Sequence, residues 1–413
     1  MKEKKVLFIG LVWPEPTSSA AGFRMMQLID TFINRSYHIT FASAAAKSPY
    51  SAPLLSLGVH EEAIMLNSSS FDEFIVQLQP DIVVFDRFMV EEQYGWRVAQ
   101  HCPSALRVLD TEDLHFLRQA RQTCVKNKGD FSFQELFTDT AKREVASILR
   151  CDLSLIISES EMKLLIEVFR IPPDILYYLP FLEDEISSSE LKQWKTFGER
   201  KNLLFIGNFI HEPNWHTVQY LKTQIWPQLR KLLPQVELHI YGAYATQKVL
   251  QLNNPKENFF IKGRAESARP TMENYRLLVA PIQFGAGVKG KFIDAMQTGT
   301  PSITTTVGAE AMKGNLNWNG VIEDNPEAFC RKTAELYENE NLWNTAQAHG
   351  IRIINERYEK RKYQADFMTN LSLLKVQIDR HRQQNFISQI LLHHTMQSTK
   401  YMSLWIEEKN KTP

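Results

Sequence analysis

Short apolar runs alternate with longer amphipathic segments along most of the chain, and this alternation constrains the fold more than any other feature. Candidate strands in the first half are residues 6–9, 37–43, 81–85, 106–109 and 153–158. The intervening segments carry apolar side chains at helical spacing, as in residues 23–33 and in a helix expected over 133–148. Strands that alternate with helices predict an α/β domain in which helices cover both faces of a parallel sheet.

The alternation stops at residues 183–200, EDEISSSELKQWKTFGER, which are polar and charged and predict an interdomain linker. It resumes with candidate strands at 203–206, 237–241, 259–261, 277–280 and 302–305, and with helices at 215–233 and 291–297. We therefore expect two Rossmann-like domains with parallel sheets that face a cleft: residues 1–185, a linker at 186–200, and residues 201–356. Ligands of such sheets bind outside the carboxyl ends of the strands.

The chain continues beyond the second predicted sheet. Residues 357–375 predict a long helix, which we expect to cross back to the N-terminal domain. Residues 376–413 predict a helical tail whose apolar side chains include Phe386, Ile390, Met402 and Trp405. Because apolar stripes on helices usually face a core, we favour docking of this tail on the protein's own surface. Contact with a partner or a membrane is the alternative.

Composition excludes several classes of protein. Lysine plus arginine and aspartate plus glutamate both number 47, so a strongly basic nucleic-acid binder is disfavoured. Residues 1–200 carry a net charge of −7 and the remaining residues +7, which suits an anionic ligand in the second half or reflects chance. The four cysteines form no C-x-x-C pair, so neither a zinc site nor a disulfide framework is expected. No apolar stretch reaches the roughly 18 residues of a membrane span, and a cytoplasmic protein is expected.

The most informative segment is residues 281–308, PIQFGAGVKGKFIDAMQTGTPSITTTVG. Its glycines, Gly285, Gly287 and Gly290, allow backbone amides to approach a ligand before a helix that begins near Lys291. A helix N-terminus attracts anions, and Lys289 and Lys291 add full positive charge there. Asp294 follows Lys291 by one helical turn. A lysine for a phosphate beside a carboxylate for a ribose diol predicts a nucleotide site; a solvated Lys291–Asp294 pair is the alternative. The fingerprints of P-loop hydrolases and of dinucleotide-binding dehydrogenases are absent.

Four segments together resemble the group 1 glycosyltransferases of family 4, which are retaining enzymes of GT-B fold. GAGVKGKFIDAMQTGTPSITTTVGAEAM resembles their donor-site signature, and LFIGNFIHEPNWHTVQYLKTQIWPQL the opening of their second domain. DTEDLHFLRQAR and CDLSLIISESEMKLL resemble bacterial members that build surface polysaccharides. The resemblance covers about residues 5–365. It implies transfer of a sugar from a nucleotide-sugar to an acceptor hydroxyl, without a metal ion or another cofactor.

The resemblance also implies roles for single residues. Lys291 matches the lysine that contacts the diphosphate, and Asp294 matches an acidic residue, usually glutamate, that holds the ribose. Three positions depart from the pattern: Ala286 replaces a glutamate, while Asn208 and Pro213 replace an arginine and a lysine. The missing phosphate charge is therefore expected from Lys289 or Arg264. The implied donor-binding set is Gly22, Gly207, Arg264, Gly285, Gly287, Lys289, Lys291, Asp294 and Glu310.

On the acceptor side, the resemblance implies Asp110, Asp113 and His115, which follow a predicted strand. His115 resembles a histidine that contacts the transferred sugar, so His115 and Lys291 are the expected catalytic residues. The acceptor is expected to be a saccharide or a lipid-linked saccharide, and a lipid-linked acceptor would bring the protein to the inner face of the membrane through a peripheral contact. A non-catalytic nucleotide-sugar-binding or scaffold protein, and an epimerase of the same fold, are the alternatives.

Overall fold

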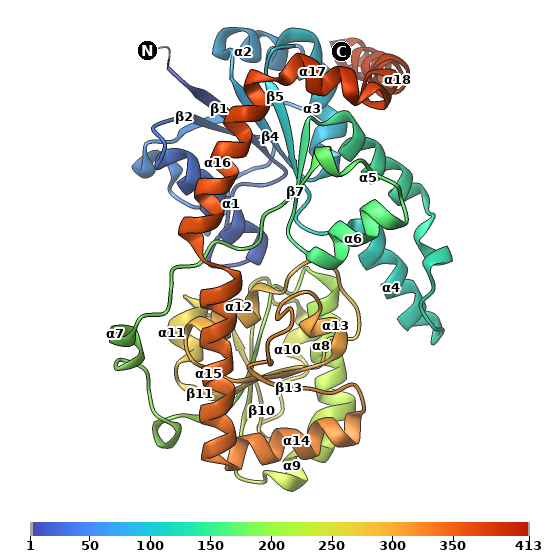
Figure 1. Ribbon diagram of the computed structural model, residues 1–413. Helices are drawn as coiled ribbons and strands as arrows, with labels where there is room; N and C mark the ends of the chain where they lie inside the picture. The colour runs from blue at the N-terminus through green and yellow to red at the C-terminus, as the bar shows by residue number, and fades with distance from the viewer. Residues whose placement is uncertain (1–2, 412–413) are drawn as a thin grey trace.

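The computed structural model describes residues 3–411 as two α/β domains stacked end to end (Figure 1). The first contains a seven-stranded parallel sheet with the order β3-β2-β1-β4-β5-β6-β7. The second contains a six-stranded parallel sheet with the order β10-β9-β8-β11-β12-β13. The predicted α/β fold with two parallel sheets is confirmed.

The elements of the first domain alternate along the chain. Its strands are β1 (Lys5–Gly10), β2 (His38–Ser43), β3 (His60–Ala63), β4 (Ile82–Asp86), β5 (Leu106–Asp110), β6 (Leu153–Ile156) and β7 (Leu176–Tyr178). Its helices are α1 (Ala20–Ile33), α2 (Ser70–Leu78), α3 (Phe88–His101), α4 (His115–Asn127), α5 (Asp139–Arg150) and α6 (Glu159–Glu167). Successive residues of β1 point into different cores, Leu7 and Ile9 into one and Val6 and Phe8 into the other, because side chains alternate across a strand.

The second domain repeats this alternation around one large apolar core. Its strands are β8 (Lys201–Ile206), β9 (Leu238–Tyr241), β10 (Phe259–Gly263), β11 (Tyr275–Ala280), β12 (Ser302–Thr304) and β13 (Gly320–Ile322). Its helices are α8 (Glu212–Tyr220), α9 (Trp226–Leu232), α10 (Gln247–Leu250), α11 (Ala268–Met272), α12 (Gly290–Gln297), α13 (Thr306–Ala309), α14 (Pro326–Glu338) and α15 (Glu340–Arg357). The segment between the domains contains the short helix α7 (Ser188–Leu191).

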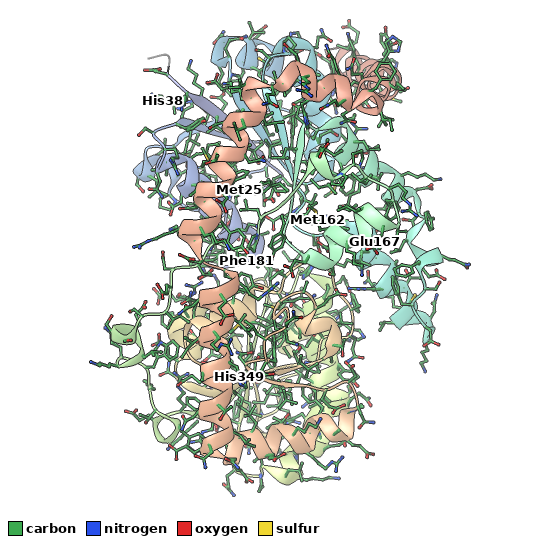
Figure 2. All side chains as sticks on the ribbon, viewed as in Figure 1. Met25, His38, Met162, Glu167, Phe181 and His349 are labelled. Carbon is green, nitrogen blue, oxygen red and sulfur yellow. The ribbon has the colours of Figure 1, made fainter. Side chains whose placement is uncertain are left out.

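The chain crosses between the domains twice, and the two crossings lie side by side. The amide of Glu183 donates to the carbonyl of Tyr358 at 2.8 Å, and the amide of Lys360 donates to the carbonyl of Glu183 at 2.8 Å. Helix α16 (Lys360–Val376) then packs on the first domain through Phe367, Met368 and Leu371, whereas α15 belongs to the second (Figure 1). Phe181 lies beside these crossings, at the junction between the domains (Figure 2).

Two predicted helices are interrupted, each for an identifiable reason. The helix expected over 133–148 begins only at Asp139, because the Thr138 side chain caps it by accepting a hydrogen bond from the Ala141 amide. The helix expected over 215–233 contains a π-turn at Leu221–Ile225. Pro227 lacks the N–H that an α-helix needs at that position, so the regular ladder cannot pass through it.

The tail forms α17 (Ile378–Gln384) and α18 (Phe386–Lys411), and α18 docks on α3 and α5. The docking contacts are polar: Ser388 donates to the carbonyl of Arg150 at 3.2 Å, and Arg97 donates to the Ser403 hydroxyl at 3.2 Å. The tail thus lies on the protein's own surface, as favoured from the sequence; Leu391 and Ile406 of its apolar stripe are half-buried, whereas Phe386, Ile390, Met402 and Trp405 are exposed. In residues 3–411, none of the helices has the length and apolar character needed to cross a bilayer.

Candidate functional site

Loops that follow the carboxyl ends of strands in both sheets meet at the junction between the domains. The loop after β11 touches the loop after β5, since a Cβ built on Gly287 would lie 2.9 Å from the Cβ of Asp113. Gly287 has a φ of +62°, a conformation that glycine adopts without strain. We call the loops after β1, β4 and β5 of the first domain and after β8, β10, β11 and β12 of the second the interdomain site.

Two half-buried lysines lie in the interdomain site at the start of α12. The Nζ of Lys291 donates to Oδ1 of Asn214 at 2.7 Å and lies 4.2 Å from the centroid of the Phe205 ring. Burial, and then the charge of Lys289, lower the pKa of Lys291 to about 7. Burial likewise lowers the pKa of Lys289 to about 8, and its Nζ donates to the Gly287 carbonyl at 3.0 Å. Among the described residues no carboxylate forms a salt bridge with either lysine, although the charges of Glu310, Glu161 and Asp113 favour the charged form of Lys289. A bound anion would further favour the charge that burial disfavours.

Asn214 reaches Lys291 because Gly207 leaves room for it. A Cβ on Gly207 would lie 2.6 Å from Cγ of Asn214. The Nδ2 of Asn214 also donates a hydrogen bond to the carbonyl of Asn208 at 2.9 Å. Gly207 and Asn208 follow β8 directly. The loop at the start of the second domain is thus shaped to present an amide side chain, rather than a charged one, to Lys291.

Asp294 is held by Arg269 and not by Lys291, the partner considered from the sequence. Its Oδ1 accepts a hydrogen bond from Nε of Arg269 at 2.8 Å, and Arg269 also donates to Glu183 at 2.8 Å. Burial raises the pKa of Asp294, although the Arg269 guanidinium opposes this. The alternative of a solvated Lys291–Asp294 pair is therefore wrong. Oδ2 of Asp294 accepts no hydrogen bond from any described residue, which leaves one carboxylate oxygen for a ligand.

The first domain contributes the acidic segment between the end of β5 and the start of α4. Its three residues that were expected on the acceptor side have different surroundings. Asp110 is fully buried and forms an ion pair with Nη2 of Arg24 at 2.9 Å, so it anchors α1 and presents no free carboxylate to an acceptor, contrary to expectation. Asp113 is paired with Arg118; although burial alone would raise the pKa of Asp113, that guanidinium holds it well below its usual range. His115 starts α4, and its Nδ1 lies 3.2 Å from the Asp113 carbonyl.

Two further predicted residues, Glu310 and Arg264, make contacts across the junction between the domains, whereas the predicted Gly22 is buried. Arg121 makes two hydrogen bonds of 2.7 Å to Glu310 and donates to the carbonyl of Gly285 at 2.9 Å, so it links α4 of the first domain to the second. Arg264 donates to the Thr17 hydroxyl at 2.6 Å, again across the junction. Gly22 lies within α1, where its amide donates to the capping Ser19 hydroxyl at 3.0 Å.

Glu161 is a buried carboxyl group of the site that the sequence reasoning missed. Its Oε1 accepts hydrogen bonds from the amides of Gly287 at 2.7 Å and Leu114 at 3.3 Å. Burial, and then the charge of Asp113, raise the pKa of Glu161 to about 8. The available signal was its spacing: Glu161 stands four residues before the buried Leu165 on α6, where a core residue is expected.

Arg87 and Glu112 were also missed, and both have strained backbones. Arg87 has φ 72° and ψ 158°, and Glu112 has φ 62°. Conformations of this kind cost roughly 1–3 kcal/mol in residues other than glycine and are concentrated at functional sites. Burial, and then the charge of Asp110, raise the pKa of Glu112 well above its usual range. Neither residue belongs to a sequence pattern that reports backbone conformation.

A sequence model of the family described as "Glycosyl transferases group 1" matches residues 200–339, the part that holds the glycine loop and both lysines. The fold is that of the GT-B glycosyltransferases. TarM of S. aureus has a TM-score of 0.56 and 14% identity; the alignment covers 72% of this chain and 57% of TarM. Anabaena HepE, solved with UDP and glucose, has a TM-score of 0.63 and 14% identity, over 90% of this chain and all of HepE.

A curated relative is similar over a shorter stretch. It is an uncharacterized 44.6 kDa protein from the cps region of Klebsiella pneumoniae, 22% identical over 168 residues. These residues are 39% of this chain and 43% of the relative, so the chain spans less than half of the relative's length. Among residues 3–411, no group of three or more histidine, cysteine, aspartate or glutamate side chains is placed to hold a metal ion.

Proposed function

We propose that the protein transfers a sugar from a nucleotide-sugar donor to an acceptor hydroxyl. The observation that carries this proposal is the pair of half-buried lysines at the glycine loop, neither of which forms a salt bridge with a described carboxylate, in the segment that matches the group 1 glycosyl transferases. Lys291 and Lys289 with the loop amides would receive the diphosphate. The free oxygen of Asp294 would accept a hydrogen bond from a ribose hydroxyl.

In the proposed reaction, the bond between the sugar C1 and the β-phosphate oxygen breaks, and its electron pair stays on the phosphate. Lys291, Lys289 and the start of α12 stabilise the negative charge that grows there. The acceptor oxygen forms the new bond to C1, and its proton passes to the departing phosphate. We propose retention at C1, as the resemblance implies, because the phosphate then lies on the face that the acceptor approaches. In this scheme the lysines stabilise the negative charge of the departing phosphate, as a metal ion does in other enzymes.

The setting of the reaction is also a proposal. HepE was solved with UDP and glucose, and TarM with UDP and α-GlcNAc-glycerol, so a uridine diphosphate sugar is the first donor to test. The Klebsiella relative comes from a cps region, which favours polysaccharide or glycoconjugate biosynthesis. We propose a saccharide or lipid-linked acceptor used in the cytoplasm, at the inner face of the membrane where the acceptor carries a lipid.

A thermal-shift panel of nucleotides and nucleotide-sugars tests the donor site. A ligand at about 100 times its Kd adds about 2.7 kcal/mol of stability. We expect stabilisation by one class of nucleotide in the wild type and in K231A, which removes an exposed lysine of α9, and its loss in K291A. If no nucleotide stabilises the wild type, the proposal fails. Product analysis with the binding donor then separates transfer from the binding-only alternative, in which the donor stays intact.

A further inference from the structure

Arg87 combines a backbone that glycine would suit better with a position at the carboxyl end of a central strand. It follows β4 directly, and its φ of 72° and ψ of 158° lie in a region that is essentially restricted to glycine. Its amide donates to the carbonyl of Asp110 at 2.8 Å, which fixes the residue in this conformation. The chain therefore keeps a long charged side chain where a glycine would be less strained.

The guanidinium of Arg87 has hydrogen-bond donors that no described residue uses. Its Nε lies 3.4 Å from Oδ1 of Asp86, and within residues 3–411 its two terminal nitrogens make no hydrogen bond. The side chain is 19% exposed, so a ligand can reach it. By contrast, Arg24, Arg118 and Arg121 each form hydrogen bonds to a carboxylate.

The surroundings place Arg87 near the glycine loop. Asp86 is paired in register with Asp110, and the loop after Asp110 contacts Gly287. His211, from the loop after β8, senses the same cations: burial and the charges of Arg118, Lys291 and Arg87 lower its pKa to about 4. The charge of Asp113 opposes this shift, so cationic and acidic side chains both surround the histidine. Burial would lower the pKa of Arg87, but nearby carboxylates, with Asp86 first, raise it.

We propose that Arg87 binds the β-phosphate of the donor from the side of the first domain. This inference rests on the proposed function. A guanidinium can donate two parallel hydrogen bonds to a phosphate, and its charge persists at every relevant pH. The contact would then stabilise the leaving group together with Lys291.

The test compares a nucleoside diphosphate with its monophosphate by calorimetry, starting with UDP and UMP and continuing with the GDP and ADP pairs. We expect R87Q to lose about 10- to 100-fold in diphosphate affinity, the range for a charged hydrogen bond, and less than about 3-fold in monophosphate affinity. R143Q is the matched control, because Arg143 pairs with Glu92 on the surface near Phe88. If R87Q keeps the wild-type ratio of the two affinities, the inference is wrong while the proposed function stands. If the wild type binds no nucleotide, the proposed function fails first.

A second variant separates a binding role from a structural one. R87G removes the guanidinium but suits the backbone conformation, so we expect it to melt at or above the wild-type temperature. It should nevertheless lose diphosphate affinity as R87Q does. A purely structural Arg87 predicts the reverse: R87G would melt lower and bind the diphosphate as tightly as the wild type, and that result would overturn the inference.

Discussion

At the scale of the residue, Lys291 predicts that diphosphate binding depends on pH. Its pKa of about 7 lies below the ordinary 10.5, so its amine loses its charge as the pH rises through about 7. A bound diphosphate favours the charged amine and raises that pKa, so binding takes up a proton between the two pKa values. We expect affinity for the nucleoside diphosphate to fall by up to about tenfold per pH unit above pH 7.

Calorimetry between pH 6 and 9, in two buffers of different ionisation enthalpy, measures both the affinity and the proton uptake. Lys289, with a pKa of about 8, contributes to the same slope. K291R keeps a positive charge throughout this range, so its affinity should vary less with pH. Equal slopes for the wild type and K291R would show that Lys291 is not the titrating group.

The candidate site was predictable where residues belong to a local motif. Lys289, Lys291 and the glycines lie within seven residues, so one stretch of sequence predicted an anion site. Arg87 and Glu161 come from separate strands and helices, and only the packing of the domains brings them to that stretch. Asp110 was expected to face an acceptor but does not. The sequence does not reveal that Arg24, 86 residues away, forms an ion pair with its carboxylate.

At the scale of the element, the contact between α6 and the glycine loop predicts an effect on stability. Glu161 accepts two backbone amides, and in E161A these buried donors lose their partner. We expect E161A to lose about 1–3 kcal/mol of unfolding free energy, whereas E161Q keeps the accepting oxygen and loses less. Urea unfolding at pH 5 measures both variants, and an equal loss in the two would contradict the role of these hydrogen bonds.

The contribution of this contact to the unfolding free energy depends on pH. The pKa of Glu161 is raised from 4.5 to about 8 in the folded protein, so its contribution to stability is fully present below pH 4.5 and disappears as the pH rises through 8. E161Q has no such titration. Because only the wild type loses stability over this range, we expect the stability deficit of E161Q relative to the wild type at pH 5 to shrink between pH 5 and 8. Repeating the urea series at pH 8 tests this, and a constant difference would show that Glu161 is ionised throughout.

Most elements were predictable because their residues decide them locally. The buried strand β4 begins with a continuous apolar run, as parallel strands covered on both faces do, and β5 differs by its Arg107. The short β3, β7 and β13 were missed: β3 has the sequence HEEA, and the other two have three residues each, so their pairing depends on the neighbouring strand. The tail α18 docks on the protein's own surface, as favoured from the sequence, but no amphipathic pattern indicates the hydrogen bonds of Ser388 and Ser403.

At the scale of the whole molecule, the two domains are held together by polar contacts across the junction. Tyr244 donates to Glu15 at 2.7 Å, Arg269 bridges to Glu183, and Arg121 pairs with Glu310. Some of these polar contacts come from helices, and Ile157 and Phe181 add apolar packing against the core of the second domain. Interdomain interfaces of this partly polar kind allow relative domain motion. The ligand would have to enter between the loops of the interdomain site, so the closed arrangement is expected to open and reclose.

The Arg121–Glu310 pair offers the cleanest test of this motion. R121A removes both hydrogen bonds to Glu310 and the bond to the Gly285 carbonyl, and its partly exposed pair contributes at most about 1 kcal/mol to stability. We expect R121A to fold normally but to populate more open molecules, with a larger radius of gyration in X-ray scattering. Since binding requires closure, its nucleotide affinity should fall several-fold, in proportion to the population that remains closed.

E92Q provides the control, because Glu92 pairs with Arg143 within the first domain and touches no residue of the second. Its scattering and nucleotide affinity should match those of the wild type. Saturating nucleotide should bring the radius of gyration of R121A back to the wild-type value, because the ligand binds the closed form preferentially and shifts the population toward it. An R121A protein that scatters like the wild type without ligand, yet binds nucleotide several-fold more weakly, would place Arg121 in direct contact with the ligand instead of in domain closure.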